Sequence, residues 1–290
     1  MNTEKTGSSL FILYDQLRWE EKAIIESAKK KGIDIGIVNC RNTIIDLEQN
    51  EDYSDRIMIQ RCVSYYNNVH TTAAIEGLGA IVINSLQTAI FCGNKLFSHM
   101  KLRKAGVNVP RAFCAFSQES ALTGLGDHGY PKVIKPVVGS WGRLIALLKD
   151  KESAEAVIED REHMYPLYHI YYFEDYVTRP PRDIRAIVVG DMVAAAIYRY
   201  SGNDSWKTNM ALGGTAKSCE ITKELEEICL RAAKAVNAEI AGVDLMESDD
   251  RGLLVHEVNN TTEFKNAVRV TGVDIPSIMI DHCIKLKKRQ

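Results

Sequence analysis

Three oxygen-bearing side chains near the end of the chain have the types and spacing that bind a divalent cation. Glu257 and Asn259 are two residues apart in an apolar run, so they project from the same face if this run is a strand. The apolar run 240–246 before it also has strand character and contains Asp244. Residues 248–252, Ser-Asp-Asp-Arg-Gly, are typical of a turn. The sequence therefore predicts a β-hairpin that carries both acidic residues.

The symmetry of this hairpin predicts which residues face each other. If it is symmetric about Asp250 and Arg251, Asp244 lies directly opposite Glu257, with Cβ atoms about 5 Å apart. Such a pair of carboxylates repels, and Mg²⁺ relieves the repulsion because proteins hold it through one or two carboxylates and phosphate oxygens. Two acidic residues at a solvated strand end are the alternative. In a regular strand His256 faces away from Glu257, so we expect it to pack beneath the sheet.

A glycine-rich loop earlier in the chain indicates a polyphosphate site. The run 131–138 has strand character and contains Lys135, and it is followed by Gly139-Ser-Trp-Gly-Arg143 and a second apolar run, 144–148. Backbone N–H groups of such a loop can point at phosphates, and Arg143 adds charge. The loop is not a P-loop, because it lacks the Gly-Lys-Ser/Thr ending and leads into a strand. For the loop alone, a plain hairpin turn is the alternative interpretation.

A second glycine pattern does not indicate a nucleotide site. Gly124-Leu-Gly126-Asp-His-Gly129 matches the dinucleotide-binding fingerprint, which requires a strand before it and a helix after it. Here the preceding residues 117–123 have helical character and a strand follows Pro131. We therefore interpret this segment as a tight loop.

Composition limits the class of protein. A chain of 290 residues with 46% hydrophobic and 26% charged residues is long enough for two or three lobes with buried cores. No apolar run approaches the roughly 20 residues of a membrane span, and the polar start does not resemble a signal peptide, so we expect a cytoplasmic protein that does not enter membranes. The seven cysteines are scattered and odd in number, which favours reduced thiols. A net charge of −2 gives no indication of nucleic-acid binding.

The order of these parts resembles the ATP-grasp superfamily and, within it, the LysX/ArgX/RimK group of ligases. The resemblance implies an α/β fold in which an N-terminal open α/β lobe precedes two α+β lobes that clasp ATP. The resemblance divides the chain into three lobes, at residues 1–92, 93–172 and 173–290. The densest matches are Cys92-Gly-Asn-Lys95, Lys135 to Arg143, Phe173 to Val177, Arg182 to Arg185, Val243-Asp-Leu245 and Glu257 to Asn266.

The resemblance also implies roles for individual residues. It implies about two Mg²⁺ ions at Asp244, Glu257 and Asn259. It places Arg199, which would neutralise the transferring phosphoryl group, and Asn209 at the reaction centre. The implied ATP-binding residues are Lys95, Lys135, Gly139, Ser140, Trp141, Gly142, Arg143, Glu174, Asp175, Tyr176, Val177, Asp183 and Arg185. The implied substrate-binding residues are Met210, Ala211, Glu263, Phe264, Lys265, Asn266 and Ala267.

The function implied by the resemblance is an ATP- and Mg²⁺-dependent carbon–nitrogen ligase of lysine biosynthesis. LysX members join the α-amino group of α-aminoadipate, through an acyl phosphate, to the side-chain carboxylate of the C-terminal glutamate of LysW, an acidic carrier protein. In this group, Asn and a small residue after Glu-Phe-Lys accompany α-aminoadipate, whereas Gly-Phe accompanies glutamate, and Asn266-Ala267 stands here. We also expect a homo-oligomer. The alternatives are glutamate as substrate, with or without α-aminoadipate, a RimK-like protein glutamate ligase and a non-enzymatic ATP-binding regulator.

Overall fold

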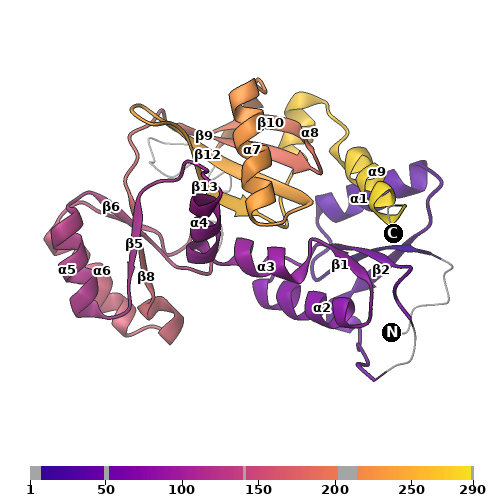
Figure 1. Cartoon of the computed structure of the whole chain (residues 1–290), viewed down its shortest axis with the longest axis horizontal. Coiled ribbons are helices and arrows are strands. Elements are labelled where there is room, and N and C mark those ends of the chain that lie inside the picture. The colour runs from indigo at the N-terminus through magenta and orange to yellow at the C-terminus, as the bar shows by residue number, and fades with distance from the viewer. Residues whose placement is uncertain (1–7, 49–51, 140–141, 202–213, 289–290) are drawn as a thin grey trace.

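The computed structural model describes residues 8–48, 52–139, 142–201 and 214–288 of the chain. It contains three separate β-sheets that follow one another along the sequence. Figure 1 shows the third sheet lying between the first and the second in an elongated molecule. The first strand of the described chain and its last helix, α9 (Ile275–Lys287), both lie on the side of the first sheet (Figure 1).

The first sheet is parallel, which confirms the N-terminal open α/β lobe that the resemblance implies. Its strand order is β2-β1-β3-β4, and neighbouring strands are paired in parallel throughout. In such a sheet the carboxyl ends of the strands meet at one edge, where ligands commonly bind. The elements are β1 (Leu10–Tyr14), α1 (Trp19–Lys30), β2 (Ile35–Asn39), a 3₁₀ helix (Cys40–Asn42), β3 (Ile57–Gln60), α2 (Tyr65–Gly77) and β4 (Ile81–Ile83).

Two short helices, α3 (Leu86–Gly93) and α4 (Lys95–Lys104), connect the first sheet to the rest of the chain. The sequence predicts a helix over 93–106 that contains Lys95, and α4 confirms it, beginning directly after Asn94. The Asn94 side chain accepts hydrogen bonds from the backbone N–H groups of Leu96 and Phe97, which caps α4. The backbone N–H of Lys95 donates to the carbonyl of Val137. The cap therefore holds Lys95 against the segment that leads into the glycine-rich loop.

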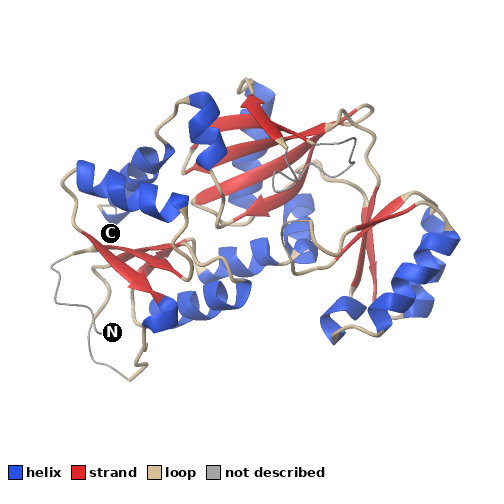
Figure 2. Ribbon diagram, turned by 180° about the vertical axis from the view of Figure 1, so that it is seen from behind, coloured by secondary structure: helices blue, strands red, loops and turns tan. Residues whose placement is uncertain are grey.

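The second sheet is antiparallel and contains the predicted hairpin around the glycine-rich loop. Its order is β5-β8-β6-β7, and β6 pairs with β7 on either side of that loop. Figure 2 shows helices covering one side of this sheet. The elements are β5 (Ala112–Ala115), α5 (Gln118–His128), β6 (Lys132–Lys135), β7 (Ala146–Leu148), α6 (Lys151–Glu162), a 3₁₀ helix (Pro166–His169) and β8 (Tyr171–Asp175).

The interpretation of residues 124–129 as a tight loop is wrong. Helix α5 continues through Gly124 and Gly126 and ends at His128, and Gly129 caps it with a φ of +70°. Gly124 is packed closely, because a Cβ built there would lie 2.8 Å from the ring of Phe113. Gly124 therefore permits close packing of the helix on the sheet, whereas Gly126 has open space around it, and only Gly129 makes a turn.

The third sheet is antiparallel, with the order β11-β10-β9-β12-β13. One of its faces packs against α7, and the other packs against α8 and α9. Alternate residues of β9 enter the two cores, as expected for a sheet covered on both faces. The elements are β9 (Arg182–Val189), β10 (Met192–Tyr200), β11 (Thr215–Ser218), α7 (Lys223–Ala235), β12 (Ile240–Ser248), β13 (Gly252–Asn259), α8 (Lys265–Thr271) and α9 (Ile275–Lys287).

The beginning and the end of the chain share one hydrophobic core. Ile12 of β1 and Ile24 of α1 belong to the same buried cluster as Ile197 of β10 and Met279 of α9. Helix α9 contacts α1 and β3 as well as β9 and β10. The first and third sheets are therefore joined by packing. The chain divisions at 92 and 172 remain a prediction.

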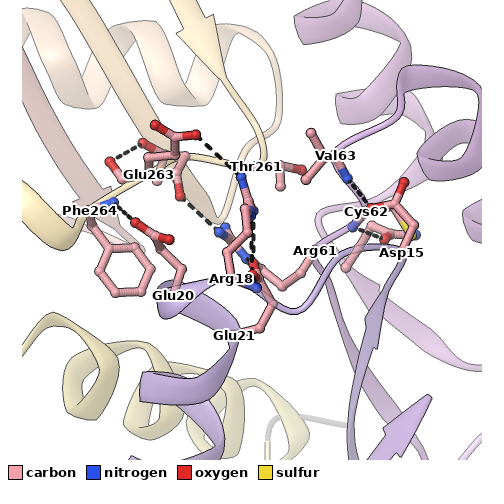
Figure 3. A network of polar contacts seen from close by, with 12 residues as sticks. Asp15, Arg18, Glu20, Glu21, Arg61, Cys62, Val63, Thr261, Glu263 and Phe264 are labelled. Atoms are coloured by element: carbon pink, nitrogen blue, oxygen red, sulfur yellow. Dashed lines mark hydrogen bonds and ion pairs between the residues drawn. The ribbon is translucent and has the colours of Figure 1, made fainter. Parts of the chain in front are cut away.

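A buried ion pair adds a polar connection between these two parts. The guanidinium of Arg61, 1% exposed, donates through Nε to Glu21 Oε1 at 2.9 Å and through Nη2 to the carbonyl of Thr262 at 3.0 Å. Figure 3 shows Arg61 and Glu21 side by side beneath the segment from Thr261 to Phe264. The loop after β13 is thus fixed by a side chain from the first sheet.

We predict that Arg61→Met lowers the free energy of unfolding by about 3 kcal/mol, because it leaves the buried Glu21 carboxylate with one cation fewer and the Thr262 carbonyl without its donor. Chemical denaturation followed by circular dichroism measures the change. The control is Lys30→Met, which breaks an exposed pair with Glu26 and costs about 0.5 kcal/mol or less. Equal effects of the two substitutions would contradict a structural role for Arg61.

Candidate active site

One large pocket, of about 1090 Å³, lies where the three sheets meet. Lys135 and Glu174 line it from the second sheet, Asp244 and Glu257 line it from the third sheet, and Arg18 lines it from the loop after β1. Ligand sites form preferentially in such clefts between lobes. Polar residues that are far apart in the sequence are therefore gathered around one space.

The predicted pairing of Asp244 with Glu257 is confirmed, although the hairpin is not symmetric in the way the sequence suggests. Next to the turn, Ser248 pairs with Gly252, and the same register continues as far as Leu245 with Val255. The turn is therefore centred on Asp250 alone. The register then shifts by one residue, and Asp244 pairs with Glu257. This shift is a β-bulge, in which two residues on one strand oppose one on the other. The bulge compensates for the displaced turn centre.

The bulge also overturns the expectation for His256. As the extra residue of the bulge, His256 lines the pocket together with Glu257 and does not pack beneath the sheet. Burial, with the cations of Lys135 and Arg199 nearby, lowers the pKa of His256 well below its usual value, so the imidazole is neutral at pH 7. A neutral imidazole donates a hydrogen bond from one ring nitrogen and accepts one at the other.

Asp244 is surrounded by cations. Arg185 donates two hydrogen bonds of 2.7 Å to its carboxylate, and Arg199 lies 3.1 Å from Oδ2. Arg199 also forms a paired contact with Asp183, at 2.6 and 2.8 Å. Burial alone would raise the pKa of Asp244, but the two guanidinium groups outweigh burial and hold the pKa well below its usual range. The Asp244 carboxylate is therefore ionised at any physiological pH.

Glu257 is less buried and contacts a lysine. Its side chain is 28% exposed, and Lys95 Nζ lies 3.3 Å from Oε1. The same ammonium donates to the carbonyl of Gly139 at 2.9 Å. Lys95 thus connects the acidic hairpin to the first residue of the glycine-rich loop.

The donor set fits magnesium. Asp244 and Glu257 provide carboxylate oxygens and Asn259 an amide group, all on the pocket side of one hairpin. Such oxygen-only sets suit hard cations, which keep water or phosphate oxygens in the remaining positions. Within the described ranges no group of three or more His, Cys, Asp or Glu forms a denser metal site. Assignment of the ion to these three residues remains a prediction.

A buried chain of polar contacts orients Lys135. Its ammonium lies 2.5 Å from Glu174 Oε2, and the other oxygen of Glu174 accepts a 2.9 Å hydrogen bond from Tyr172. The Tyr172 hydroxyl also contacts His99 Nδ1 of α4 at 3.0 Å. Burial and the neighbouring Glu174 raise the pKa of Tyr172 well above its usual value, so the phenol stays a donor. Lys135 is therefore held in a fixed position, as a phosphate-binding cation requires.

Most residues predicted to bind ATP lie around the pocket. Arg143 is an exception, because it is exposed and is not among the residues that line the pocket. Ser140 and Trp141 lie outside the described residues. Those that do line the pocket are Lys95, Lys135, Gly139, Gly142, Glu174, Asp175, Tyr176, Val177, Asp183 and Arg185.

The predicted substrate segment divides into two groups. Glu263, Lys265 and Asn266 line the pocket, whereas Phe264 and Ala267 are 0% and 1% exposed and belong to the core shared by the first and third sheets. Phe264 and Ala267 therefore do not contact a ligand in the pocket. They determine how α8 packs, and thereby where Asn266 lies. Asn209, Met210 and Ala211 lie outside the described residues.

Sequence reasoning missed the residues that the first sheet contributes. Arg18 and Glu20 follow β1, and Cys62, Tyr65 and Asn68 follow β3. A signal existed, because both groups come directly after buried strands of an open parallel sheet, at the edge where ligands commonly bind.

Comparison with known proteins identifies the class first. The model of the RimK-like ATP-grasp domain matches residues 92–283. The solved structure of a RimK domain ATP-grasp protein from Sphaerobacter thermophilus superimposes with a TM-score of 0.76 and 21% identity, covering 95% of this chain and 99% of the other. The fold is therefore the ATP-grasp fold.

Two further similarities identify the group within this class. Residues 10–91 match the model of the LysX preATP-grasp domain. The alpha-aminoadipate–LysW ligase LysX of Sulfurisphaera tokodaii is 36% identical over 275 residues, 93% of this chain and 96% of that protein. The glutamate–LysW ligase ArgX of the same organism is 29% identical over 272 residues, with the same coverage.

The chain belongs to the RimK-like ATP-grasp family, in its LysX group. It is an ATP-dependent carboxylate–amine ligase, and enzymes of this family use ATP with a divalent metal ion. A purely regulatory role is therefore excluded. Within the described ranges, no helix is both long and apolar enough to cross a lipid bilayer.

We predict that Lys135→Ala raises the dissociation constant for ATP at least about tenfold, because a buried, oriented cation is lost from the pocket. Titration calorimetry measures the affinity. Lys132→Ala is the control, since Lys132 is equally buried on the same strand but pairs with Asp175 and does not line the pocket. Unchanged ATP affinity in Lys135→Ala would remove Lys135 from the nucleotide site.

Proposed function

We propose that this enzyme joins the α-amino group of α-aminoadipate to the side-chain carboxylate of the C-terminal glutamate of a LysW-type carrier protein. The observation that carries the proposal is the continuity of the pocket. Lys135 and Glu174 line one part of it, and Lys265 and Asn266 of the predicted substrate segment line another. A ligase needs this arrangement, because the activated carboxylate and the incoming amine must meet in one enclosed space.

The proposed reaction has two steps. An oxygen of the carrier's carboxylate attacks the γ-phosphorus of ATP, so that an acyl phosphate forms and ADP leaves. The amine nitrogen then attacks the acyl carbon, phosphate leaves with the C–O bond electrons, and the nitrogen loses a proton as the amide forms. Neither step requires a covalent bond to the enzyme. The protein therefore acts through position and charge.

The residues of the pocket have the charges that this reaction needs. Lys135 and Lys95 would bind phosphate oxygens, and Arg199, fixed by Asp183, would stabilise the charge on the transferring group. Asp244, Glu257 and Asn259 would hold about two Mg²⁺ ions, which lower the negative charge on the phosphates. Lys95 now contacts Glu257 and would turn toward the nucleotide when the metal takes its place.

The choice of amino acid depends on Asn266. Glutamate is one methylene shorter than α-aminoadipate, and one methylene accounts for only about 1–3 kcal/mol of discrimination. Selectivity must therefore depend on where the distal carboxylate finds its donors. The greater identity to LysX than to ArgX, 36% against 29%, supports α-aminoadipate. Glutamate remains the second candidate substrate, because an ArgX relative covers the same share of the chain.

A direct assay tests the proposal. The enzyme is incubated with ATP, Mg²⁺, a LysW-type carrier and either amino acid, and the carrier is weighed by mass spectrometry. We expect a mass increase equal to α-aminoadipate minus water, together with ADP. Addition of glutamate alone would replace the first candidate by the second. Addition of glutamate residues to the terminus of another protein would favour a RimK-like activity.

We predict that Glu257→Gln lowers the rate of ligation at least about 100-fold while the melting temperature stays close to that of the wild type. The amide cannot replace the negative charge that the metal site requires, and Glu257 is at the surface of the pocket and not in a core. The control is Glu247→Gln, which removes a carboxylate from β12 that pairs with Arg182 outside the pocket. Rates within a few fold of the wild type for Glu257→Gln would refute the metal assignment.

We predict that Asn266→Gly lowers kcat/KM for α-aminoadipate about tenfold, because it removes an amide donor from the pocket. Asn266→Asp lowers it further, because it places a carboxylate opposite that of the substrate. Ala267→Phe is unsuitable as a test, since Ala267 is fully buried and a larger ring there would strain the core. If Asn266→Asp retained full activity, Asn266 would not contact the substrate carboxylate.

A further inference from the structure

The part of the pocket formed by the first sheet contains an arginine that the predicted reaction does not use. Arg18 precedes α1 and lines the pocket together with Glu263, Lys265 and Asn266. Its side chain is 20% exposed, so it is accessible from the cavity yet largely enclosed.

Arg18 is held rigidly along one edge. Its Nε donates to Glu21 Oε2 at 3.1 Å and its Nη2 to Oε1 at 2.8 Å. Glu21 is fully buried and is fixed in turn by Arg61. Burial would raise the pKa of Glu21, but the two arginines outweigh burial and lower it. The carboxylate is therefore ionised and keeps the Arg18 guanidinium in one orientation (Figure 3).

The other edge of this guanidinium has only a weak partner. Nη1 lies 3.5 Å from Glu263 Oε1, at the limit of a hydrogen bond, and the Glu263 side chain is 50% exposed. Glu20, the other nearby carboxylate, instead accepts the backbone N–H groups of Phe264 and Lys265. An incoming carboxylate could therefore displace Glu263, which is free to turn toward solvent.

The distance to the metal residues suits a small dicarboxylic molecule. Glu263 lies four positions after Asn259, so their Cα atoms are at most about 14 Å apart. The amine must reach the acyl carbon beside the metal residues, and the α-carboxylate is bonded to the same carbon as the amine. Of the two carboxylates of the substrate, only the distal one extends to the far part of the pocket.

We propose that Arg18 Nη1 binds the side-chain carboxylate of the dicarboxylic amino-acid substrate, with Glu21 and Arg61 holding it in position. This inference rests on the proposed function. It adds a substrate-binding site contributed by the first sheet, outside the Glu263–Ala267 segment. Arg18 selects for an acidic side chain, and Asn266 on α8 then senses the length of that side chain.

The test compares three amines in the wild type and in Arg18→Met, with ATP, Mg²⁺ and the carrier present. α-Aminoadipate has both carboxylates, 2-aminohexanoate lacks the distal one and 5-aminopentanoate lacks the α-carboxylate. We expect Arg18→Met to lower kcat/KM about 10- to 100-fold for α-aminoadipate and 5-aminopentanoate, and less than threefold for 2-aminohexanoate. Where turnover of 2-aminohexanoate is too slow to measure, its inhibition constant against α-aminoadipate replaces it.

Two further variants control for stability and for charge. Arg18→Lys keeps a cation beside Glu21 but loses the forked geometry, so we expect an intermediate loss that is again confined to amines with a distal carboxylate. Lys30→Met removes a cation from the exposed end of α1 and leaves all three rates unchanged. The ratio of rates between amines does not depend on how much of a variant is folded.

The possible outcomes separate the two proposals. Equal losses for α-aminoadipate and 2-aminohexanoate would show that Arg18 contacts the carrier or only supports the fold, and would overturn this inference. A loss for 2-aminohexanoate but not for 5-aminopentanoate would assign Arg18 to the α-carboxylate and overturn it as well. A wild-type enzyme that joins no amino acid to the carrier contradicts the proposed function itself.

Discussion

The repulsion between Asp244 and Glu257 is the constraint around which the pocket is organised. A β-bulge places the two carboxylates opposite each other on one hairpin, one of them almost fully buried. Uncompensated charges in such a position would cost several kcal/mol each. Arg185 and Arg199 balance Asp244, and Lys95 balances Glu257. Each of these cations also lines the space where the nucleotide is expected.

One of these cations, Lys95, contacts both the hairpin and the glycine-rich loop. Lys95 bridges Glu257 and the carbonyl of Gly139, so the same ammonium neutralises the metal residue and holds the start of the glycine-rich loop. A metal ion at Glu257 would repel the Lys95 ammonium, and a phosphate group in the pocket would attract it. The contact between Lys95 and the Gly139 carbonyl would then be lost. A metal ion at Glu257 would therefore change the contacts of Gly139 as well.

Local features of the fold could be predicted from the sequence, and long-range ones could not. The alternation of strands and helices and the two hairpins follow from periodicity and turn residues. The pairing of Asp244 with Glu257 was predicted from a symmetric turn and is correct only because a bulge offsets the displaced turn centre. The bulge could not be predicted, because its extra residue, His256, changes the register without changing the composition of the strand. The burial of Phe264 and Ala267 was missed for a related reason. It depends on α1 and α9, which no nearby residue specifies.

The contribution of the first sheet is the clearest case of such long-range dependence. In the sequence, nothing distinguishes Arg18, Glu21 and Arg61 from ordinary charged residues at the ends of strands and helices. In the structure they form a largely buried cluster beneath the loop that follows β13. Because the first and third sheets share one core, this cluster cannot move independently of the hairpin that carries Asp244 and Glu257. An amino acid held at Arg18 would therefore be fixed relative to the metal residues by packing. Rigid placement of this kind reduces the entropic cost of bringing amine and acyl group together, which is how a ligase without a covalent nucleophile accelerates its reaction.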